Sequence, residues 1–293
     1  MPLTLLVNPA SAGGRALKLL PRVEAALDAQ RAVFRVERTR SLEHGVDLAL
    51  RAAELGEVPV VVSGDGLMGA IGGALAGAET PVGLVPSGRG NDLARALGIP
   101  DEPEEAVAVI LGGHSRLIDV GEANGRRFLG IVSVGFDSEC NRLANETHFI
   151  RGNLVYAYSM VRTLIGWRSA RFTIVAGGER RRISGYFVDV ANNKVYGGGM
   201  YIAPEAEIDD GQFDVVAITE VGKLRFLSGL RDVLKGAHIG KPEVTTFRAS
   251  RLELDASRPF PVYADGDHLT DLPVQLKILP RCLSILVPGD GTA

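Results

Sequence analysis

The stretch PVVVSGDGLMGAI, residues 59–71, joins a run of aliphatic side chains to a glycine-rich turn and then to a segment of small residues. Short, continuous apolar runs that end at Gly and Asp are typical of a buried strand in a parallel sheet. Glycine frees backbone N–H groups in the turn, and the N-terminus of a following helix attracts anions. The stretch therefore predicts a buried strand followed by a phosphate-binding turn, within an α/β fold.

The same strand-to-helix pattern repeats on both sides of this stretch. It predicts strands over 3–7, 33–36, 58–62 and 82–86, and helices over 16–27, 43–54, 72–78, 93–97 and 104–111. Such alternation implies a parallel sheet covered by helices, with ligands bound beyond the carboxyl ends of the strands. We expect an α/β nucleotide-binding domain over residues 1–120.

The second half of the chain has a different pattern, in which strands predominate from about residue 119. Strands are predicted over 128–134, 171–176, 184–190, 213–217, 251–255 and 274–279, and helices over 151–167 and 222–235. Gly, Asn and Asp turns between the strands favour an antiparallel β-sandwich, which we expect as a β-rich lipid-substrate domain over residues 121–281. The last apolar run, 283–287, could return to either sheet, so residues 282–293 could rejoin the first domain.

Size and composition narrow the class of protein. A chain of 293 residues exceeds the usual span of one hydrophobic core and favours two domains. The net charge of −3 gives no overall field to attract nucleic acid. With Cys140 and Cys282 as the two cysteines, neither a disulfide framework nor a zinc site is indicated, and no secretory or membrane-spanning run is evident. We expect a cytoplasmic protein that meets a membrane from solution.

Three glycine-rich turns follow three of the predicted strands in the first half. They are NPASAGG (8–14), SGDG (63–66) and PSGRGND (86–92). All three should emerge at one edge of the sheet, where backbone amides can converge on phosphate oxygens. One such turn alone would be an ordinary connection, but three together favour a shared anion site. The chain contains no GxxxxGK[ST], and no GxGxxG follows the first strand, so this site does not use the commonest nucleotide motifs.

Charged residues in these turns could complete the anion site. Arg15 and Arg89 could supply the positive charge that a lysine supplies in other phosphate loops. Asp65 and Asp92 could hold Mg²⁺, directly or through water. Each aspartate could equally be a helix N-cap.

Several motifs together resemble the diacylglycerol kinase catalytic-domain family of soluble lipid kinases. In order along nearly the whole chain they read NPASAGG, SGDGLMG, PSGRGNDLARALGIP, GFDS, NNKVYGGGMYIAPEAEIDDGQFDV and ADGD. The GDG turn alone is shared with NAD kinases and phosphofructokinases, whereas the combination is specific. The resemblance implies transfer of the ATP γ-phosphate to diacylglycerol or a related lipid, such as a sphingoid base, ceramide or phosphatidylglycerol. It places the active site in a cleft between an α/β and a β-rich domain.

The resemblance also implies roles for individual residues. The nucleotide-binding residues would be Asn8, Arg15, Thr39, Ser63, Gly64, Asp65, Gly66, Leu67, Arg89 and Asn91. Asp65, Asp92 and Asp119 would form a network with Mg²⁺ and water. The catalytic base would be Asp265 or Asp267, and the choice stays open because Asp267 stands where glutamate is usual. Alternatively, the Asp-Gly sequence here forms only a hairpin turn.

A second, structural metal ion is implied by the same resemblance. It would match Asp210 and the backbone carbonyls near Glu207 and Gln212. An ordinary acidic turn explains these residues equally well.

Departures from the family pattern leave the substrate open. Ser63, Leu67 and Gly69-Ala70 replace parts of the GGDGT and Asn-Glu pattern common in bacterial members, which makes the turn more similar to that of sphingosine and ceramide kinases. One alternative is an NAD kinase-like phosphotransferase, against which the YGGG and ADGD segments argue. The other is a non-catalytic nucleotide- or lipid-binding protein that keeps the fold.

Two segments could contact lipid. The helix predicted over 151–167, preceded by His148, Phe149 and Ile150, could lie at a membrane interface or pack as a core helix. The basic run 180–182 could contact anionic head groups or form a solvated turn. The expected partners are a lipid substrate and, transiently, a membrane surface; a homodimer is left open.

Overall fold

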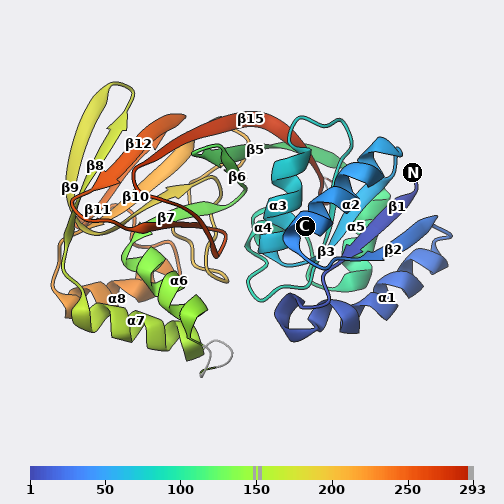
Figure 1. Ribbon diagram of the computed structural model, residues 1–293, viewed down its shortest axis with the longest axis horizontal. Helices are drawn as coiled ribbons and strands as arrows, with labels where there is room; N and C mark the ends of the chain where they lie inside the picture. The colour runs from blue at the N-terminus through green and yellow to red at the C-terminus, as the bar shows by residue number, and fades with distance from the viewer. Residues whose placement is uncertain (148–149, 151–153, 290–293) are drawn as a thin grey trace.

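A computed structural model describes residues 1–147, 150 and 154–289 of the chain (Figure 1). An α/β unit and a β-rich unit lie side by side, and the long strands β5 and β15 run between them. This arrangement confirms the predicted fold class, a parallel α/β domain followed by an antiparallel β-rich domain. None of the described helices is long and apolar enough to cross a bilayer.

The N-terminal unit is built on a four-stranded parallel sheet in the order β2-β1-β3-β4. Its strands are β1 (Leu3–Val7), β2 (Phe34–Arg38), β3 (Val58–Ser63) and β4 (Gly83–Pro86). Its helices are the 3-10 helix η1 (Ser11–Gly13), α1 (Arg15–Ala29), α2 (Leu42–Glu54), α3 (Asp65–Leu75), α4 (Asp92–Ala96) and α5 (Pro103–Gly112). The predicted order of strands and helices is confirmed.

The register of this sheet brings the three glycine-rich turns to one edge. Val7, the last residue of β1, pairs with Val62, and Ser63 pairs with Pro86 at the ends of β3 and β4. The turns that follow these strands therefore leave the sheet next to one another, as the sequence predicts.

Helix α3 begins earlier than the sequence predicts. The prediction starts at residue 72, whereas the helix starts at Asp65, directly after the GDG turn. Gly66 and Gly69 in its first turns interrupt the helical spacing of apolar residues, so the sequence pattern does not predict a helix there. Their lack of side chains lets other segments approach, since a Cβ at Gly66 would lie 2.9 Å from Asp267 Oδ2.

The C-terminal unit is an eleven-stranded sheet with helices against one of its faces (Figure 1). Its strands are β5 (Ser115–Ala123), β6 (Arg126–Phe128), β7 (Ile131–Gly135), β8 (Ala170–Ala176), β9 (Glu179–Ala191), β10 (Phe213–Thr219), β11 (Val244–Ala249), β12 (Arg251–Ala256), β13 (Pro261–Ala264), β14 (Asp267–Asp271) and β15 (Val274–Leu286). Its helices are α6 (Phe136–Glu146), α7 (Leu154–Gly166) and α8 (Lys223–Val233). The pairings within this sheet are antiparallel.

Helix α6 and strands β5, β11, β13 and β14 are not in the prediction. The sequence of α6, FDSECNRLANE, carries few apolar residues. Helix α7 is described from Leu154 onward, so the predicted helical residues 151–153, and His148 and Phe149 before them, lie outside the described residues.

The last two predicted strands, 274–279 and 283–287, form the single strand β15. This strand pairs with β5 along most of its length, with an irregularity between Leu279 and Leu283. Near its end Ile285 also forms a parallel bridge with Val82, beside β4. The final apolar run therefore contacts both sheets.

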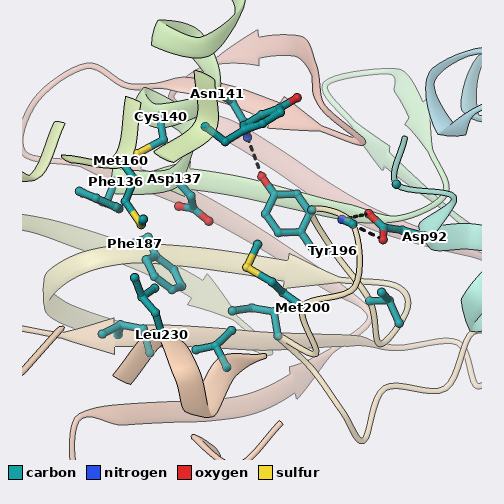
Figure 2. Close-up of a pocket in the computed structure, with 18 of the residues that line it drawn as sticks. Asp92, Phe136, Asp137, Cys140, Asn141, Met160, Phe187, Tyr196, Met200 and Leu230 are labelled. Atoms are coloured by element: carbon teal, nitrogen blue, oxygen red, sulfur yellow. Dashed lines mark hydrogen bonds between the residues drawn. The ribbon is translucent and has the colours of Figure 1, made fainter. Parts of the chain in front are cut away.

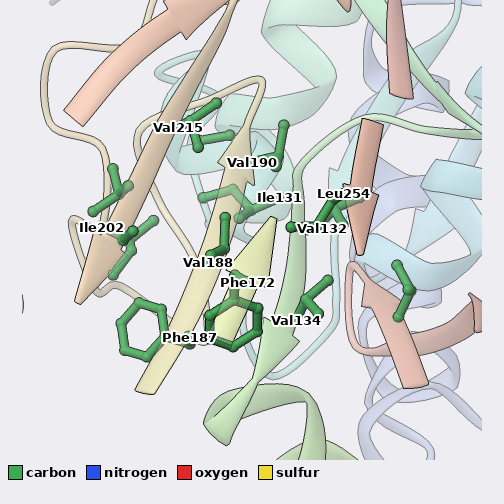
Figure 3. Packing of buried hydrophobic residues seen from close by; sticks show 14 of the residues in the cluster. Ile131, Val132, Val134, Phe172, Phe187, Val188, Val190, Ile202, Val215 and Leu254 are labelled. Carbon is green, nitrogen blue, oxygen red and sulfur yellow. The ribbon is translucent and has the colours of Figure 1, made fainter. Parts of the chain in front are cut away.

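The hydrophobic core has a part that is shared between the two units. The C-terminal sheet has its own cluster, which includes Phe172, Val188 and Val215 (Figure 3). A second cluster combines Met68 and Ile71 of α3 with Ile118 of β5 and Leu283 and Ile285 of β15. Burial of these side chains holds the two units together and fixes the space between them.

Candidate active site

The second and third glycine-rich turns touch each other through their glycines. A Cβ at Gly64 would lie 2.7 Å from Cα of Gly88, closer than side chains allow. The backbone N–H of Ser87 donates to the carbonyl of Ser63 at 2.8 Å. Asn91 stabilises the third turn, because its Oδ1 accepts the N–H of Gly88 at 2.8 Å. Asn91 is thereby part of the turn structure itself.

The first turn is tied to the third. Ser11 Oγ donates to the carbonyl of Ser87 at 3.2 Å, and a guanidinium nitrogen of Arg15 donates to the carbonyl of Gly88 at 3.3 Å. Asn8 Oδ1 accepts the N–H of Ala10 within the turn at 3.0 Å. The structure thus brings together the three turns that the sequence singles out.

Three other predicted nucleotide residues have different surroundings. Arg89 is exposed and lines the pocket described below. Thr39 is buried, and its Oγ1 donates to the carbonyl of Val7 at 3.4 Å. Leu67 is buried in the shared core, against the position that a Cβ at Gly45 would take.

Asp65 and Asp92 face each other across Gly90. A Cβ at Gly90 would lie 3.2 Å from Oδ2 of each aspartate. Asp65 Oδ1 accepts the N–H of Leu93 at 3.1 Å, and both oxygens of Asp92 accept the N–H of Gly198, at 3.0 and 2.9 Å. Burial raises the pKa of Asp92, the bond from Gly198 opposes this, and the charge on Asp65 adds to the rise. The Gly198 contact joins the GND loop to the YGGG segment.

Asp265 enters the same region from the turn after β13. Its Oδ2 accepts the N–H groups of Leu129 and Gly130, both at 3.2 Å, and its Oδ1 accepts that of Ile131 at 3.3 Å. Burial raises the pKa of Asp265 to about 7, and the charge on Asp65 contributes to the rise against the three hydrogen bonds. Asp265 is a fixed carboxylate that titrates near neutral pH.

The side chain of Asp267, the first residue of β14, lies against the start of α3. Its Oδ2 is 2.9 Å from the position of a Cβ at Gly66, in the GDG turn. Burial raises the pKa of Asp267, and the charge on Arg126 opposes this. The two carboxylates of the ADGD segment therefore both reach the phosphate-binding turn, one at Gly66 and the other at Gly69, where Asp265 Oδ2 is 3.4 Å from a Cβ position.

The chemistry of these side chains fits a magnesium ion. The charge on Asp65 contributes to the raised pKa of both Asp92 and Asp265, so the three carboxyl groups lie near one another. Such repulsion is relieved by a divalent cation, and Mg²⁺ prefers oxygen ligands. Within the described residues, no three His, Cys, Asp or Glu side chains already surround one ion position. The ion would therefore take further oxygens from nucleotide phosphates and water, as Mg²⁺ commonly does.

Asp119, the third residue of the implied magnesium and water network, has hydrogen-bond partners of its own, and its part in that network stays a prediction. Its Oδ2 accepts the N–H of Gly211 at 2.6 Å and its Oδ1 that of Arg281 at 2.7 Å. Its own N–H donates to the carbonyl of Ile208 at 2.8 Å. The fully buried carboxylate of Asp119 thus anchors the acidic turn and the middle of β15.

In the acidic turn, where the resemblance implies a second metal ion, the described side chains have partners within the protein. The carboxylate of Asp210 forms an ion pair with Arg248, and its Oδ1 also accepts the N–H of Gln212 at 3.0 Å. Glu207 is exposed and lies 3.5 Å from the ammonium of Lys194. The guanidinium of Arg248 already balances the charge of Asp210, and no three described His, Cys, Asp or Glu side chains gather here. The structural metal ion, whose other implied ligands are backbone carbonyls, stays a prediction.

A pocket of about 580 Å³ extends from the carboxylates into the C-terminal unit (Figure 2). Asp65, Asp92 and Asp265 line its polar end. Its interior is mainly apolar and is lined by Phe136, Cys140, Met160, Phe187, Met200, Ile202, Ile218, Val221, Phe226, Leu230 and Val233. The sequence does not reveal these residues as one pocket, because they come from α6, α7, α8, two strands and the YGGG segment.

Comparisons with known proteins agree with this geometry. Residues 2–123 match the diacylglycerol kinase catalytic domain, and residues 130–287 match the YegS C-terminal NAD kinase beta sandwich-like domain. A curated diacylglycerol kinase of Mycobacterium tuberculosis (strain ATCC 25618 / H37Rv) is 32% identical over 98% of this chain and 96% of its own. A protein of Chromohalobacter salexigens named "Probable lipid kinase YegS-like" is 29% identical over 85% of this chain and 82% of its own.

Solved structures show the same fold. A crystal structure of a diacylglycerol kinase from Bacillus anthracis str. Sterne superposes with a TM-score of 0.72, at 20% identity, and covers 98% of this chain and 97% of its own. Fold, site and relatives together define a kinase of the lipid kinase type. The chain belongs to the diacylglycerol kinase catalytic-domain family.

Proposed function

We propose that the protein transfers the γ-phosphate of ATP to the hydroxyl group of a lipid, diacylglycerol or a relative of it. The observation that supports this most strongly is the continuity of the pocket, whose carboxylate end lies beside the phosphate-binding turns and whose interior is apolar. A lipid hydroxyl could reach the carboxylates while an acyl chain stays in the apolar interior. Apolar lining with few convergent polar groups is typical of sites for such ligands.

In this proposal the turns bind the nucleotide. The backbone N–H groups at Gly64 and Gly66 and the N-terminus of α3 favour phosphate oxygens, and Arg89 adds a positive charge. Asp65 and Asp92 would hold Mg²⁺, which when bound neutralises charge on the transferring phosphoryl group. Asn91 and Arg15 act by holding the third turn in place.

The general base is proposed to be one of the two carboxylates of the ADGD segment. A base removes the proton of the lipid hydroxyl as the phosphoryl group is transferred, and it works best when its pKa lies near the operating pH. We favour Asp265, because it lines the pocket and burial brings its pKa to about 7. Asp267 is more exposed and lies outside the residues that line the pocket.

The substrate is proposed to enter from a membrane surface at α7 and α8. These neighbouring helices line the pocket, and they are linked where Lys223 Nζ donates to the carbonyl of Ile165 at 2.8 Å. Large apolar side chains are exposed on or next to them, namely Leu154, Tyr156, Val161, Ile165, Leu224, Leu227 and Leu234. Exposed basic residues accompany them, namely Arg162, Lys223, Arg231 and Lys235. Apolar and basic side chains on one surface are typical of interfacial binding.

Radiolabelled phosphate transfer from ATP to a panel of acceptors tests this function. We expect transfer to at least one lipid among diacylglycerol, sphingoid bases, ceramide and phosphatidylglycerol, in the presence of Mg²⁺. Transfer to NAD alone would favour the NAD kinase-like alternative. ATP binding without transfer to any acceptor would favour a non-catalytic role.

A further inference from the structure

Two carboxyl groups meet at the wall of the apolar pocket. Asp137 stands at the start of α6 and lines the pocket, and Asp189 lies fully buried on β9. The two carboxyl groups lie close enough for each to contribute to the shift in the other's pKa. They can bond to each other only if one of them holds a proton, because ionised carboxylates are acceptors alone.

No described positive charge balances the two carboxyl groups. Burial raises the pKa of Asp137, and burial and then the charge of Asp137 raise the pKa of Asp189. No described Lys or Arg side chain contributes to either shift. Oδ1 of Asp137 and both oxygens of Asp189 also lack a donor among the other described groups.

Three further polar side chains surround the pair. Tyr196 Oη accepts the amide N–H of Asn141 at 2.6 Å and lies 3.4 Å from Ser133 Oγ (Figure 2). Ser133 is the direct neighbour of Asp189 across β7 and β9. Ser133, Asp137, Asn141, Asp189 and Tyr196 form what we call the polar cluster, and Phe136, Phe187 and Met160 of the apolar lining lie around it.

Buried carboxylates that lack donors are unfavourable and are normally paired or hydrogen-bonded. The pocket is the direction from which a ligand could complete the polar cluster, since Asp137, Asn141 and Tyr196 all line it. The ester carbonyls of a diacylglycerol accept hydrogen bonds and donate none, so they cannot do this. A group that donates hydrogen bonds and carries a positive charge would satisfy both the open oxygens and the charge.

We propose that the polar cluster is a recognition subsite for a second hydrogen-bond donor on the lipid, and that it prefers an ammonium group to a hydroxyl. The inference rests on the proposed function, because it places the lipid in this pocket. The first hydrogen-bond donor is the hydroxyl group that receives the phosphoryl group at the carboxylate end of the pocket. The second hydrogen-bond donor lies farther along the pocket. Asp137 and Asp189 are specificity-determining residues in this reading, without a part in phosphoryl transfer.

A set of matched acceptors tests the subsite. A long-chain 2-amino-1-alkanol, the 1,2-diol and the plain 1-alkanol of the same length differ only in the second donor. We expect kcat/KM to fall in that order, with about tenfold or more between the amine and the plain alcohol, as for other hydrogen bonds to charged groups. Asp137→Asn should remove the preference, so that kcat/KM for the amine and for the plain alcohol differ by less than about threefold. Asp214→Asn is the matched control. Burial raises the pKa of the Asp214 carboxyl group to about 6, but Asp214 does not line the pocket, so this variant should keep the preference.

Equal efficiency with the three acceptors in the unaltered protein would overturn the subsite, as would an Asp137→Asn variant that keeps the preference. Absence of transfer to every lipid, diacylglycerol included, would count against the proposed function instead. Direct binding then still tests the subsite. Calorimetric titration should show hexadecylammonium binding about tenfold or more tighter than hexadecanol, and equal binding of the two would refute the proposal without any variant.

Discussion

Asp65 is the residue on which the phosphate end of the site depends. Its charge contributes to the raised pKa of both Asp92 and Asp265, so it acts on the two other carboxyl groups of the site. Replacement by asparagine removes the charge and keeps an oxygen that can accept the N–H of Leu93. The substitution therefore separates electrostatics from folding.

We predict that Asp65→Asn lowers kcat by about 100-fold or more, because charge stabilisation is the main contribution of a protein to phosphoryl transfer. Thermal unfolding should stay close to that of the unaltered protein. Transfer of labelled phosphate and the melting temperature are the two measurements. Asp47→Asn, on the exposed side of α2, is the control and should change neither. Full activity of Asp65→Asn would remove this residue from the proposed metal site.

The raised pKa of Asp265 predicts a pH dependence of activity. A base must be deprotonated to accept a proton, so with a pKa of about 7 its competent fraction rises with pH and levels off above that value. We expect kcat/KM to rise from about pH 6 to about pH 8, with Mg²⁺ and ATP held constant. Asp267→Asn should keep this profile, while Asp265→Asn should lose most activity. The reverse pattern would assign the base to Asp267.

At the scale of elements, α7 and α8 carry the proposed membrane contact. Leu224 is 84% exposed at the start of α8, and Ile165 is 68% exposed at the end of α7. We predict that Leu224→Gln combined with Ile165→Gln weakens binding to anionic vesicles, because each loses apolar area that would enter the interface. Cosedimentation with vesicles measures this, and transfer to a dispersed short-chain lipid should be unchanged.

Leu55→Gln provides the control for this surface. Leu55 is likewise 68% exposed, but it follows α2 in the N-terminal unit. Vesicle binding that falls equally in both variants, or in neither, would contradict a specific contact through α7 and α8.

The elements also show what the sequence can predict. Strands β1, β3 and β4 are continuous aliphatic runs that end in Gly, Pro or Asn turns, so their burial and the position of the turns follow from local pattern. Helix α6 is not predicted because only its first turn carries a large apolar residue, Phe136, that packs in the core. The position of Asp119 could not be predicted either, since its partners Gly211 and Arg281 are far away in the chain.

At the scale of the whole molecule, the pocket depends on the fixed position of the two units relative to each other. β15 pairs with β5, bridges to Val82 and contributes Leu283 and Ile285 to the shared core. The pocket takes its carboxylates from both units, Asp65 and Asp92 from one and Asp265 from the other. Weakening the shared core should therefore loosen the site as well as the fold.

We predict that the units unfold together and that Leu283→Ala destabilises both. The side chain is fully buried, and removal of a buried leucine costs about 2–5 kcal/mol of unfolding free energy. Trp167, the one tryptophan, reports on the C-terminal unit by fluorescence, while far-UV circular dichroism weights the helix-rich N-terminal unit. The two probes should give coincident denaturation curves, shifted equally in the variant, whereas exposed Leu55→Ala should change stability by less than about 0.5 kcal/mol. Separate transitions would mean that the shared core does not couple the units, and that the site could open without unfolding.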